Sequence, residues 1–206
     1  MSKPNVDRLC LGLQSTRIKE RTEAVVALDS ITDTRLSPKE VFAIALKCFS
    51  LVELETPLVT KGTTSASEKR VEDTTSSLKR IVSACVGRVG LTSSVPTLRS
   101  AQFIRILRKI EDHFFLESGE ILAPSSYNFL QLYNTILSKR PILDHMGTED
   151  WQNAFNFATM IAFRSLRNDI FPANASVCTE LTSSLFKTMT LLMTTDPKTG
   201  VSIVYL

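Results

Sequence analysis

Apolar residues recur with the period of an α-helix along most of this 206-residue chain. With successive residues about 100° apart, five apolar residues near the start of the chain fall within about 60° of Leu13 on a helical wheel. This pattern predicts one long first helix with a core-facing stripe. The other members of the stripe are Val6, Leu9, Ala24, Leu28 and Ile31.

The second predicted helix has a clear start. Ser37 and Glu40 form a capping box, and Pro38 occupies the first helical position, where its missing N–H costs nothing. Residues 41–49 that follow are apolar around most of the helix. A helix of this kind is covered on more than one side.

Further helices are predicted near residues 68–88, 97–116 and 126–138, and two more follow them. The weak helix propensity of residues 74–77 argues against the first of these. Thr148 offers a cap for the fourth, and Asn174 or Ser176 for the fifth. Their apolar stripes are Trp151, Phe155, Ala158, Ala162 and Leu166, and then Leu181, Leu185, Met189 and Leu192.

Breaks between these segments define the expected organisation. Pro57 is expected to end the second helix, and residues 56–67 read as a flexible loop with Gly62 and several Ser and Thr. We therefore expect a motif helix and second helix in 1–55 and further helical repeats in 68–206, about seven helices in all. No strand is predicted before the tail 201–206, whose apolar end is typical of a truncated product or a fragment.

These elements predict an all-α fold. Helix pairs that follow one another along the chain are typical of a HEAT-like α-solenoid, in which antiparallel pairs are stacked. The strongly apolar second helix favours stacking. A compact helical bundle remains the alternative, because the sequence shows no strict internal repeat.

Composition excludes several classes of protein. Glycine is scarce, with seven residues, so glycine-rich phosphate loops have few places to lie. The four cysteines are far apart and form no CxxC pair, which indicates reduced thiols in an intracellular protein rather than a disulfide framework or a zinc site. No segment reaches the ~20 apolar residues of a membrane span.

Positive charge is concentrated in the middle of the chain. Residues 61–110 contain ten Lys or Arg and three Asp or Glu. Four of these cations, Arg99, Arg105, Arg108 and Lys109, fall near one predicted helix whose apolar side would hold Leu98, Ile104, Leu107 and Ile110. They predict either a contact with nucleic acid or an acidic partner, or an ordinary amphipathic helix.

Charged residues also interrupt the apolar stripe of the first helix. Arg17 and Glu20 fall inside its arc, and Arg21 lies at its edge. A charge on a buried face must be paired, or the fold loses stability. Arg17 and Glu20 are three residues apart and are positioned to pair with each other, with a neighbouring helix or with a partner protein.

The same segment resembles the short N-terminal motif of the ATM checkpoint kinases, including the yeast telomere-maintenance member. In that motif an aliphatic residue, a basic residue, Glu-Arg and a second aliphatic residue follow at fixed spacings. The matching positions here are Leu13, Arg17, Glu20, Arg21 and Val25. The specific likeness covers about thirteen residues.

The resemblance implies the opening of a long helical solenoid that recruits a serine/threonine kinase to DNA ends through the double-strand-break sensor complex. It also implies work in the nucleus, on chromatin and at telomeres, in telomere-length maintenance and DNA damage signalling. The kinase domain, with its ATP and magnesium, would lie outside this chain. No cofactor, metal, membrane or small-molecule substrate is expected for these residues.

The residues themselves offer little chemistry. The kinase glycine loop and the HRD and DFG sequences are missing. His113 and His145 are 32 residues apart, and no spacing predicts a metal site. Besides the scaffold, two readings stay open: an unrelated helical adaptor for protein or nucleic acid, and a small helical enzyme using Cys85, Cys178, His113 or His145.

Overall fold

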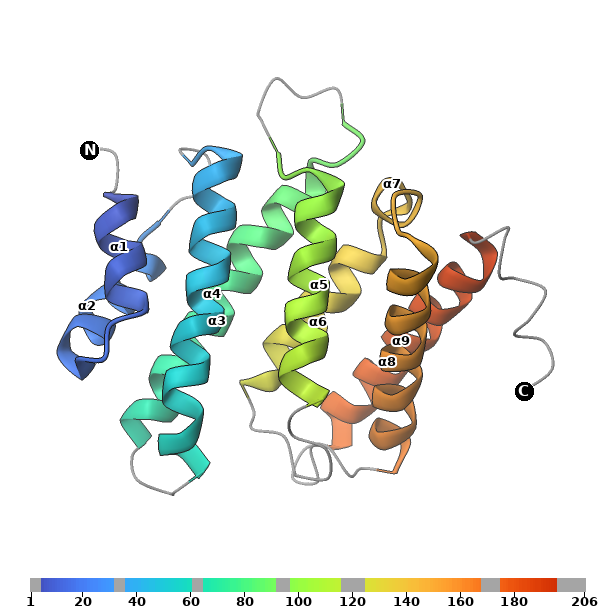
Figure 1. Cartoon of the computed structure of the whole chain (residues 1–206). Coiled ribbons are helices and arrows are strands. Elements are labelled where there is room, and N and C mark those ends of the chain that lie inside the picture. Colours follow the sequence, from blue (N-terminus) through green and yellow to red (C-terminus); the bar gives the residue numbers. More distant parts are fainter. Residues whose placement is uncertain are drawn as a thin grey trace. The chain divides into compact units, whose positions relative to one another are not determined.

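The fold is all-α, as the sequence predicts (Figure 1). A computed structural model describes residues 5–31, 36–60, 65–91, 97–115, 125–167 and 175–195. Nine helices and no strand occur within these ranges. The chain divides into two compact units, residues 1–99 and 100–206. The arrangement of helix pairs as a HEAT-like solenoid stays a prediction.

The single long first helix was a wrong prediction, because the structure has two helices there. Helix α1 spans Val6–Leu13 and helix α2 spans Ile18–Asp29. Between them the Ser15 hydroxyl accepts a hydrogen bond of 3.1 Å from the backbone N–H of Arg17. A hydroxyl that binds nearby backbone in this way favours a turn over a continuous helix. All six residues of the predicted apolar stripe are nevertheless buried.

Helix α3, Pro38–Thr60, begins as predicted. The Ser37 hydroxyl accepts a hydrogen bond from the Glu40 N–H at 3.3 Å, and the Glu40 carboxylate accepts one from the Ser37 N–H at 2.8 Å. The predicted end at Pro57 was wrong, since the helix continues to Thr60. Proline removes one backbone donor, but long helices tolerate this near an end.

Helix α4, Ser65–Gly87, forms in spite of its weak local propensity. Thr74, Thr75 and Ser77 are all buried, so packing outweighs the intrinsic preference of these residues. The loop predicted for 56–67 is shorter than expected, because α3 and α4 occupy most of it. Residues 61–64, with Gly62, lie outside the described residues.

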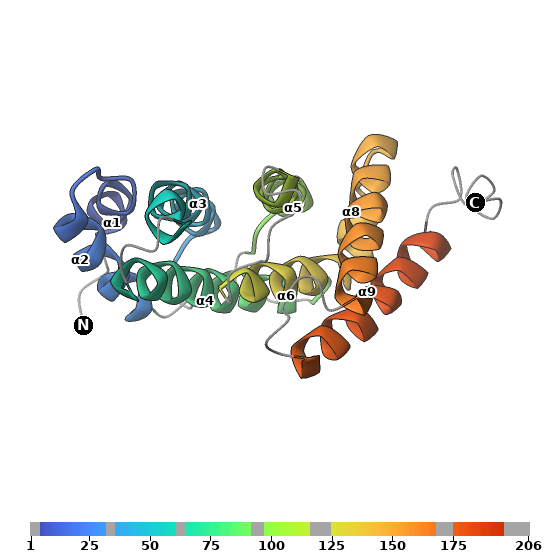
Figure 2. The ribbon, with the colours of Figure 1, turned by 90° about the horizontal axis from the view of Figure 1, so that it is seen from below.

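The first unit places its four helices in two layers (Figure 2). Helix α1 contacts α2 and α3, while α4 contacts α2 and α3. Arg80 of α4 donates hydrogen bonds to the carbonyls of Ile31 at 2.7 Å and Asp29 at 3.1 Å. The positive charge of Arg80 interacts favourably with the negative C-terminal end of the α2 dipole, and its hydrogen bonds hold α2 against α4.

The second unit contains α5 to α9. Their bounds are Ser100–Phe115, Ser126–Leu137, Arg140–Leu143, Thr148–Leu166 and Ala175–Thr195. Its core holds large fully buried side chains, among them Phe103, Phe129, Tyr133 and Phe157. The nine helices of the described ranges exceed the expected seven, because the predicted first helix is divided in two and the short α7 forms at Pro141.

Several details of the predicted caps and apolar stripes differ in the second unit. Helix α8 begins at Thr148, but Gly147 is its N-cap and no side chain caps it. Leu166 is exposed at the C-terminal end of α8 rather than buried. Leu181, Leu185 and Leu192 of α9 are buried as predicted, whereas Met189 of α9 and Phe155 of α8 are only half-buried.

Some predictions fall outside the described part of the chain. The tail 201–206, the proposed cap Asn174 and the side chains of Ser176 and Cys178 belong to this group. Among the helices that the structure describes, none is long and apolar enough to span a membrane.

Candidate functional site

The five motif residues divide into a buried set and an exposed set. Leu13 and Val25 lie in the core of the first unit, and Arg21 is also buried. The side chains of Arg17 and Glu20 are 80% and 45% exposed. The buried residues are accounted for by packing and pairing within the fold, whereas the exposed residues form part of the molecular surface.

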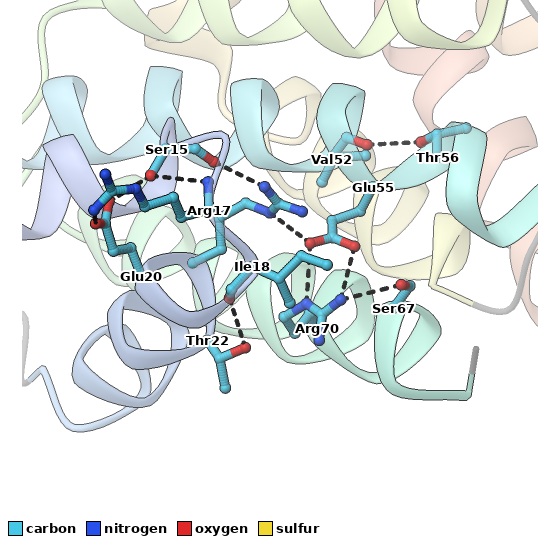
Figure 3. Close-up of polar contacts among 11 residues, drawn as sticks. Ser15, Arg17, Ile18, Glu20, Thr22, Val52, Glu55, Thr56, Ser67 and Arg70 are labelled. Carbon is cyan, nitrogen blue, oxygen red and sulfur yellow. Dashed lines mark hydrogen bonds and ion pairs between the residues drawn. The ribbon is translucent and has the colours of Figure 1, made fainter. Parts of the chain in front are cut away.

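Arg21 belongs to a buried ionic cluster that joins three helices, and Figure 3 shows the other two members, Glu55 and Arg70. Its Nε donates a 2.6 Å hydrogen bond to Oε1 of Glu55 on α3, and its Nη1 donates to the Ser15 carbonyl at 2.8 Å. Arg70 of α4 donates to both oxygens of the same carboxylate, from Nε to Oε1 and from Nη2 to Oε2, at 3.0 Å each. The Ser67 hydroxyl accepts from Arg70 Nη2 at 3.1 Å. The cluster therefore fixes α2, α3, α4 and the turn before α2 relative to one another.

The charges of this cluster are unequal. Glu55 has no solvent-exposed side-chain surface and faces two guanidinium groups, so the three residues carry a net charge of +1. Burial by itself raises the pKa of the Glu55 carboxyl, but the hydrogen bonds and charges of Arg70 and Arg21 outweigh it and lower that pKa. Glu55 is therefore ionised at neutral pH and holds the two arginines together.

The exposed motif residues meet at the turn between α1 and α2. Glu20 accepts a 2.5 Å hydrogen bond from the Ser15 hydroxyl and a 3.2 Å hydrogen bond from Nη1 of Arg17. The Ser15 hydrogen bond and the Arg17 charge lower the pKa of Glu20, although its partial desolvation acts in the opposite direction. Arg17 and Glu20 therefore form a surface ion pair. Arg21 anchors the turn that carries this pair, through its hydrogen bond to the Ser15 carbonyl.

The pairing of Arg17 with Glu20 is confirmed, but their expected place on the core-facing stripe was wrong. Because the helix is broken before Ile18, Arg17 is the N-cap of α2 and points away from the core. Arg21, which the wheel placed at the edge of the stripe, is the buried cation.

Sequence reasoning missed Glu55 and Arg70. A signal for Glu55 existed, since it follows Leu51 by four residues and Val52 by three and so shares their buried side of α3. Nothing local to Arg70 marks it as buried, because its neighbours in α4 are mostly polar.

The basic residues near α5 form an exposed face, and the predicted apolar side is confirmed. Leu98, Ile104, Leu107 and Ile110 are buried, while Arg99, Arg105, Arg108 and Lys109 are exposed. Arg108 Nε donates to Asp150 of α8 at 2.5 Å, and this contact raises the pKa of Arg108. Arg108 is therefore paired with a carboxylate of the second unit.

The histidines are placed apart from any reactive cluster. His113 packs against the rings of Phe114 and Phe129, and His145 Nδ1 lies 2.8 Å from the Pro141 carbonyl oxygen. Cys85 is buried in the first unit. Among the described residues, no three His, Cys, Asp or Glu side chains gather as metal ligands would.

Comparison with known proteins agrees with the motif. The model of a family described as telomere-length maintenance and DNA damage repair matches residues 6–152. The chain is 26% identical over 161 residues to the serine/threonine-protein kinase TEL1 of Debaryomyces hansenii, and 23% identical over 159 residues to that of Candida albicans. Each match covers 76% of this chain but only 5% of the relative's length. No solved structure matches the chain significantly.

Proposed function

Because this chain belongs to the telomere-length maintenance and DNA damage repair family, we propose that it is a non-catalytic helical scaffold of an ATM-type serine/threonine kinase. The family match over residues 6–152 carries this proposal. The chain corresponds to about 5% of the length of the curated TEL1 relatives. ATP and magnesium would then be bound by another part of the parent protein.

In this proposal the scaffold recruits the kinase to DNA double-strand breaks and telomeres, in the nucleus, by binding a break-sensor complex. The α1–α2 turn is the recruiting surface. An exposed ion pair such as Arg17–Glu20 contributes little to stability, because water and salt screen it. Its two charges are therefore available for recognition, while the buried Arg21 cluster keeps their backbone in place.

The test uses the full parent kinase with the surface charges exchanged, R17E/E20R. We expect kinase retention at an induced double-strand break to fall at least fivefold and telomeres to shorten. Kinase activity of the purified protein on a peptide substrate should remain unchanged, because these residues lie outside the catalytic domain.

A matched control exchanges a similar ion pair in the second unit, R140E/D144R, whose partners are 3.8 Å apart and exposed. This control should retain recruitment. Normal recruitment by R17E/E20R, or an equal loss of recruitment and catalytic activity, would contradict the proposal.

A further inference from the structure

An open groove runs between α1 and α2. Its volume is about 970 Å³, and its lining residues all come from α1, α2 and the segments next to them. None of the lining residues belongs to α3 or α4, which cover other faces of this helix pair. The groove is therefore a surface that the described helices of the first unit leave uncovered.

The shape of the groove suits another helix. At Gly12 an added Cβ would lie 2.8 Å from the Ala24 Cβ, so α1 and α2 approach closely there and the floor is shallow. Ala24 and Ala27 continue this small-residue floor along α2. On the α1 side the rim carries Leu11, which is 64% exposed. Small side chains below and an aliphatic side chain at the rim let a helix backbone come close and bury an apolar residue.

The charges of the groove are of opposite sign at its two ends. Gly12 lies level with Ala24 and the two helices run in opposite directions, so Arg8 lies near the C-terminal end of α2. Glu20 and Glu23 line the half nearer the α1–α2 turn. Among the described residues, neither Arg8 nor Glu23 has an ion-pair partner in the chain. Two opposite charges are thus left open to a ligand.

We propose that this groove binds an amphipathic helix of a partner protein, with a basic residue toward Glu20 and Glu23 and an acidic residue toward Arg8. At 1.5 Å per residue, Arg8 lies about 10 Å along the groove from the middle of the two glutamates. The partner's basic and acidic residues are therefore about seven positions apart, two helical turns, with an aliphatic residue between them. The partner helix runs parallel to α2, so that its positive N-terminal end lies near the glutamates.

This assignment rests on the proposed recruiting function, since it names the kind of partner that the α1–α2 surface takes. It differs from that proposal in needing no parent kinase for its test. Direct binding to the purified chain measures the groove, whereas recruitment of R17E/E20R measures the function.

The probe is an alanine-based 17-residue helical peptide that carries a lysine, a leucine four positions later and a glutamate seven positions after the lysine. Binding to the full 206-residue chain is measured by fluorescence anisotropy, and the contact surface by amide chemical shifts. We expect shift changes at Gly12, Ala24 and Ala27. Replacing Glu23 with Lys should weaken binding at least tenfold, and a peptide with glutamate in place of its lysine should restore binding to that variant.

Matched variants control for nonspecific effects. Ala27→Leu fills the groove and should abolish binding, while Thr22→Leu adds similar bulk to α2 outside the lining and should not. Glu68→Lys makes the same charge change on α4 and should leave binding unchanged. Equal binding by all variants, or no binding at millimolar peptide, would overturn the assignment. A chain dimer in sedimentation equilibrium that Ala27→Leu dissociates would overturn it too, by giving the groove to a second copy.

Discussion

Arg21 and Glu55 are 34 residues apart in the chain, yet a buried hydrogen bond of 2.6 Å joins the Arg21 Nε to the Glu55 carboxylate. This contact ties the α1–α2 segment to α3, and Arg70 extends it to α4. The motif arginine is therefore a structural residue of the first unit. Its effect on any partner surface acts through the position of the turn that contains Ser15.

Because the cluster has a net charge of +1, substitutions at Glu55 and at Arg21 should lower the free energy of unfolding by different amounts. Replacing Glu55 with Gln leaves two buried guanidinium groups facing each other, and should lower the free energy of unfolding by about 3–5 kcal/mol. Replacing Arg21 with Met leaves a neutral Arg70–Glu55 pair and removes the charge-assisted contact with Glu55 together with the hydrogen bond to the Ser15 carbonyl, a loss of about 1.5–3 kcal/mol. Urea denaturation followed by circular dichroism measures both values.

Arg17→Ala is the control for this comparison, because it removes a motif cation that is exposed. Its urea midpoint should equal that of the unmodified chain within error. The order Glu55→Gln more damaging than Arg21→Met is the diagnostic result. A larger loss of stability in Arg21→Met than in Glu55→Gln would show that the single negative charge of Glu55 is not what holds the cluster together.

Acid should weaken the first unit through Glu55. Its pKa in the fold is below its ordinary value of 4.5, so the folded state binds the proton less tightly than the unfolded state. The stability it contributes is complete above the unfolded pKa and is lost as pH falls through the folded pKa. Hydrogen exchange of α2 and α3 amides between pH 6 and pH 3 should show falling protection, and this dependence should be much weaker in Glu55→Gln.

Glu111 in the second unit should respond to pH with the opposite sign. Burial raises its pKa, although the Tyr133 hydroxyl donates a 2.6 Å hydrogen bond to it. The second unit should therefore lose stability as pH rises from about 4.5 through this raised pKa. Trp151 is the only tryptophan and lies in this unit, so its fluorescence follows the unfolding.

Glu111→Gln tests this directly. The amide can accept the same Tyr133 hydrogen bond without a charge, so this variant should be at least as stable as the unmodified chain at pH 7 and should lack the pH slope. If Glu111→Gln lowers the stability at pH 7 as much as an apolar residue at position 111 does, the ionised carboxylate is required.

The close approach of α1 and α2 predicts a strong effect at Gly12. An alanine Cβ there would lie 2.8 Å from the Ala24 Cβ and 3.3 Å from the Glu20 carbonyl, so the helices must separate. Overpacking of this kind costs about 1–3 kcal/mol, which exceeds the gain of up to about 1 kcal/mol from better helix propensity. Gly12→Ala should lower the melting temperature, and adding Ala24→Gly should recover part of the loss. A melting temperature raised by Gly12→Ala alone would exclude the tight contact.

The core of the first unit could be predicted even though its first helix was wrongly drawn as continuous. All six apolar residues of the predicted stripe are buried, Leu13 and Leu28 among them. Within α2, however, the buried side includes Arg21 and Val25, which lie at and beyond the edge of the predicted arc, and leaves out Glu20, which lies inside it. The turn itself involves the Ser15 hydroxyl, which accepts a hydrogen bond from the Arg17 N–H, and hydrophobic periodicity carries no signal of that contact.

The ionic cluster shows what sequence patterns cannot supply. The motif drew attention to Arg21, but its partner Glu55 lies on a separate helix, and Arg70 follows Glu55 by a further 15 residues. Pairing at such distances depends on how α2, α3 and α4 pack. The capping box at Ser37 was predicted correctly because all its contacts lie within four residues.

The basic face of α5 limits any direct contact with DNA. Arg108 is paired with Asp150, and the other three cations of the predicted set are Arg99, Arg105 and Lys109. If all three contact phosphates, the logarithm of the binding constant should fall with the logarithm of salt concentration with a slope no steeper than about −3. Filter binding of a 20-base-pair duplex between 50 and 200 mM salt measures this slope.

Asp150→Asn frees Arg108 and should steepen the slope by about one, whereas Glu68→Gln, a neutralisation on α4, should leave the slope unchanged. A slope that Asp150→Asn leaves unchanged would place any DNA contact elsewhere. The absence of binding at 50 mM salt would leave protein contacts as the means of recruitment.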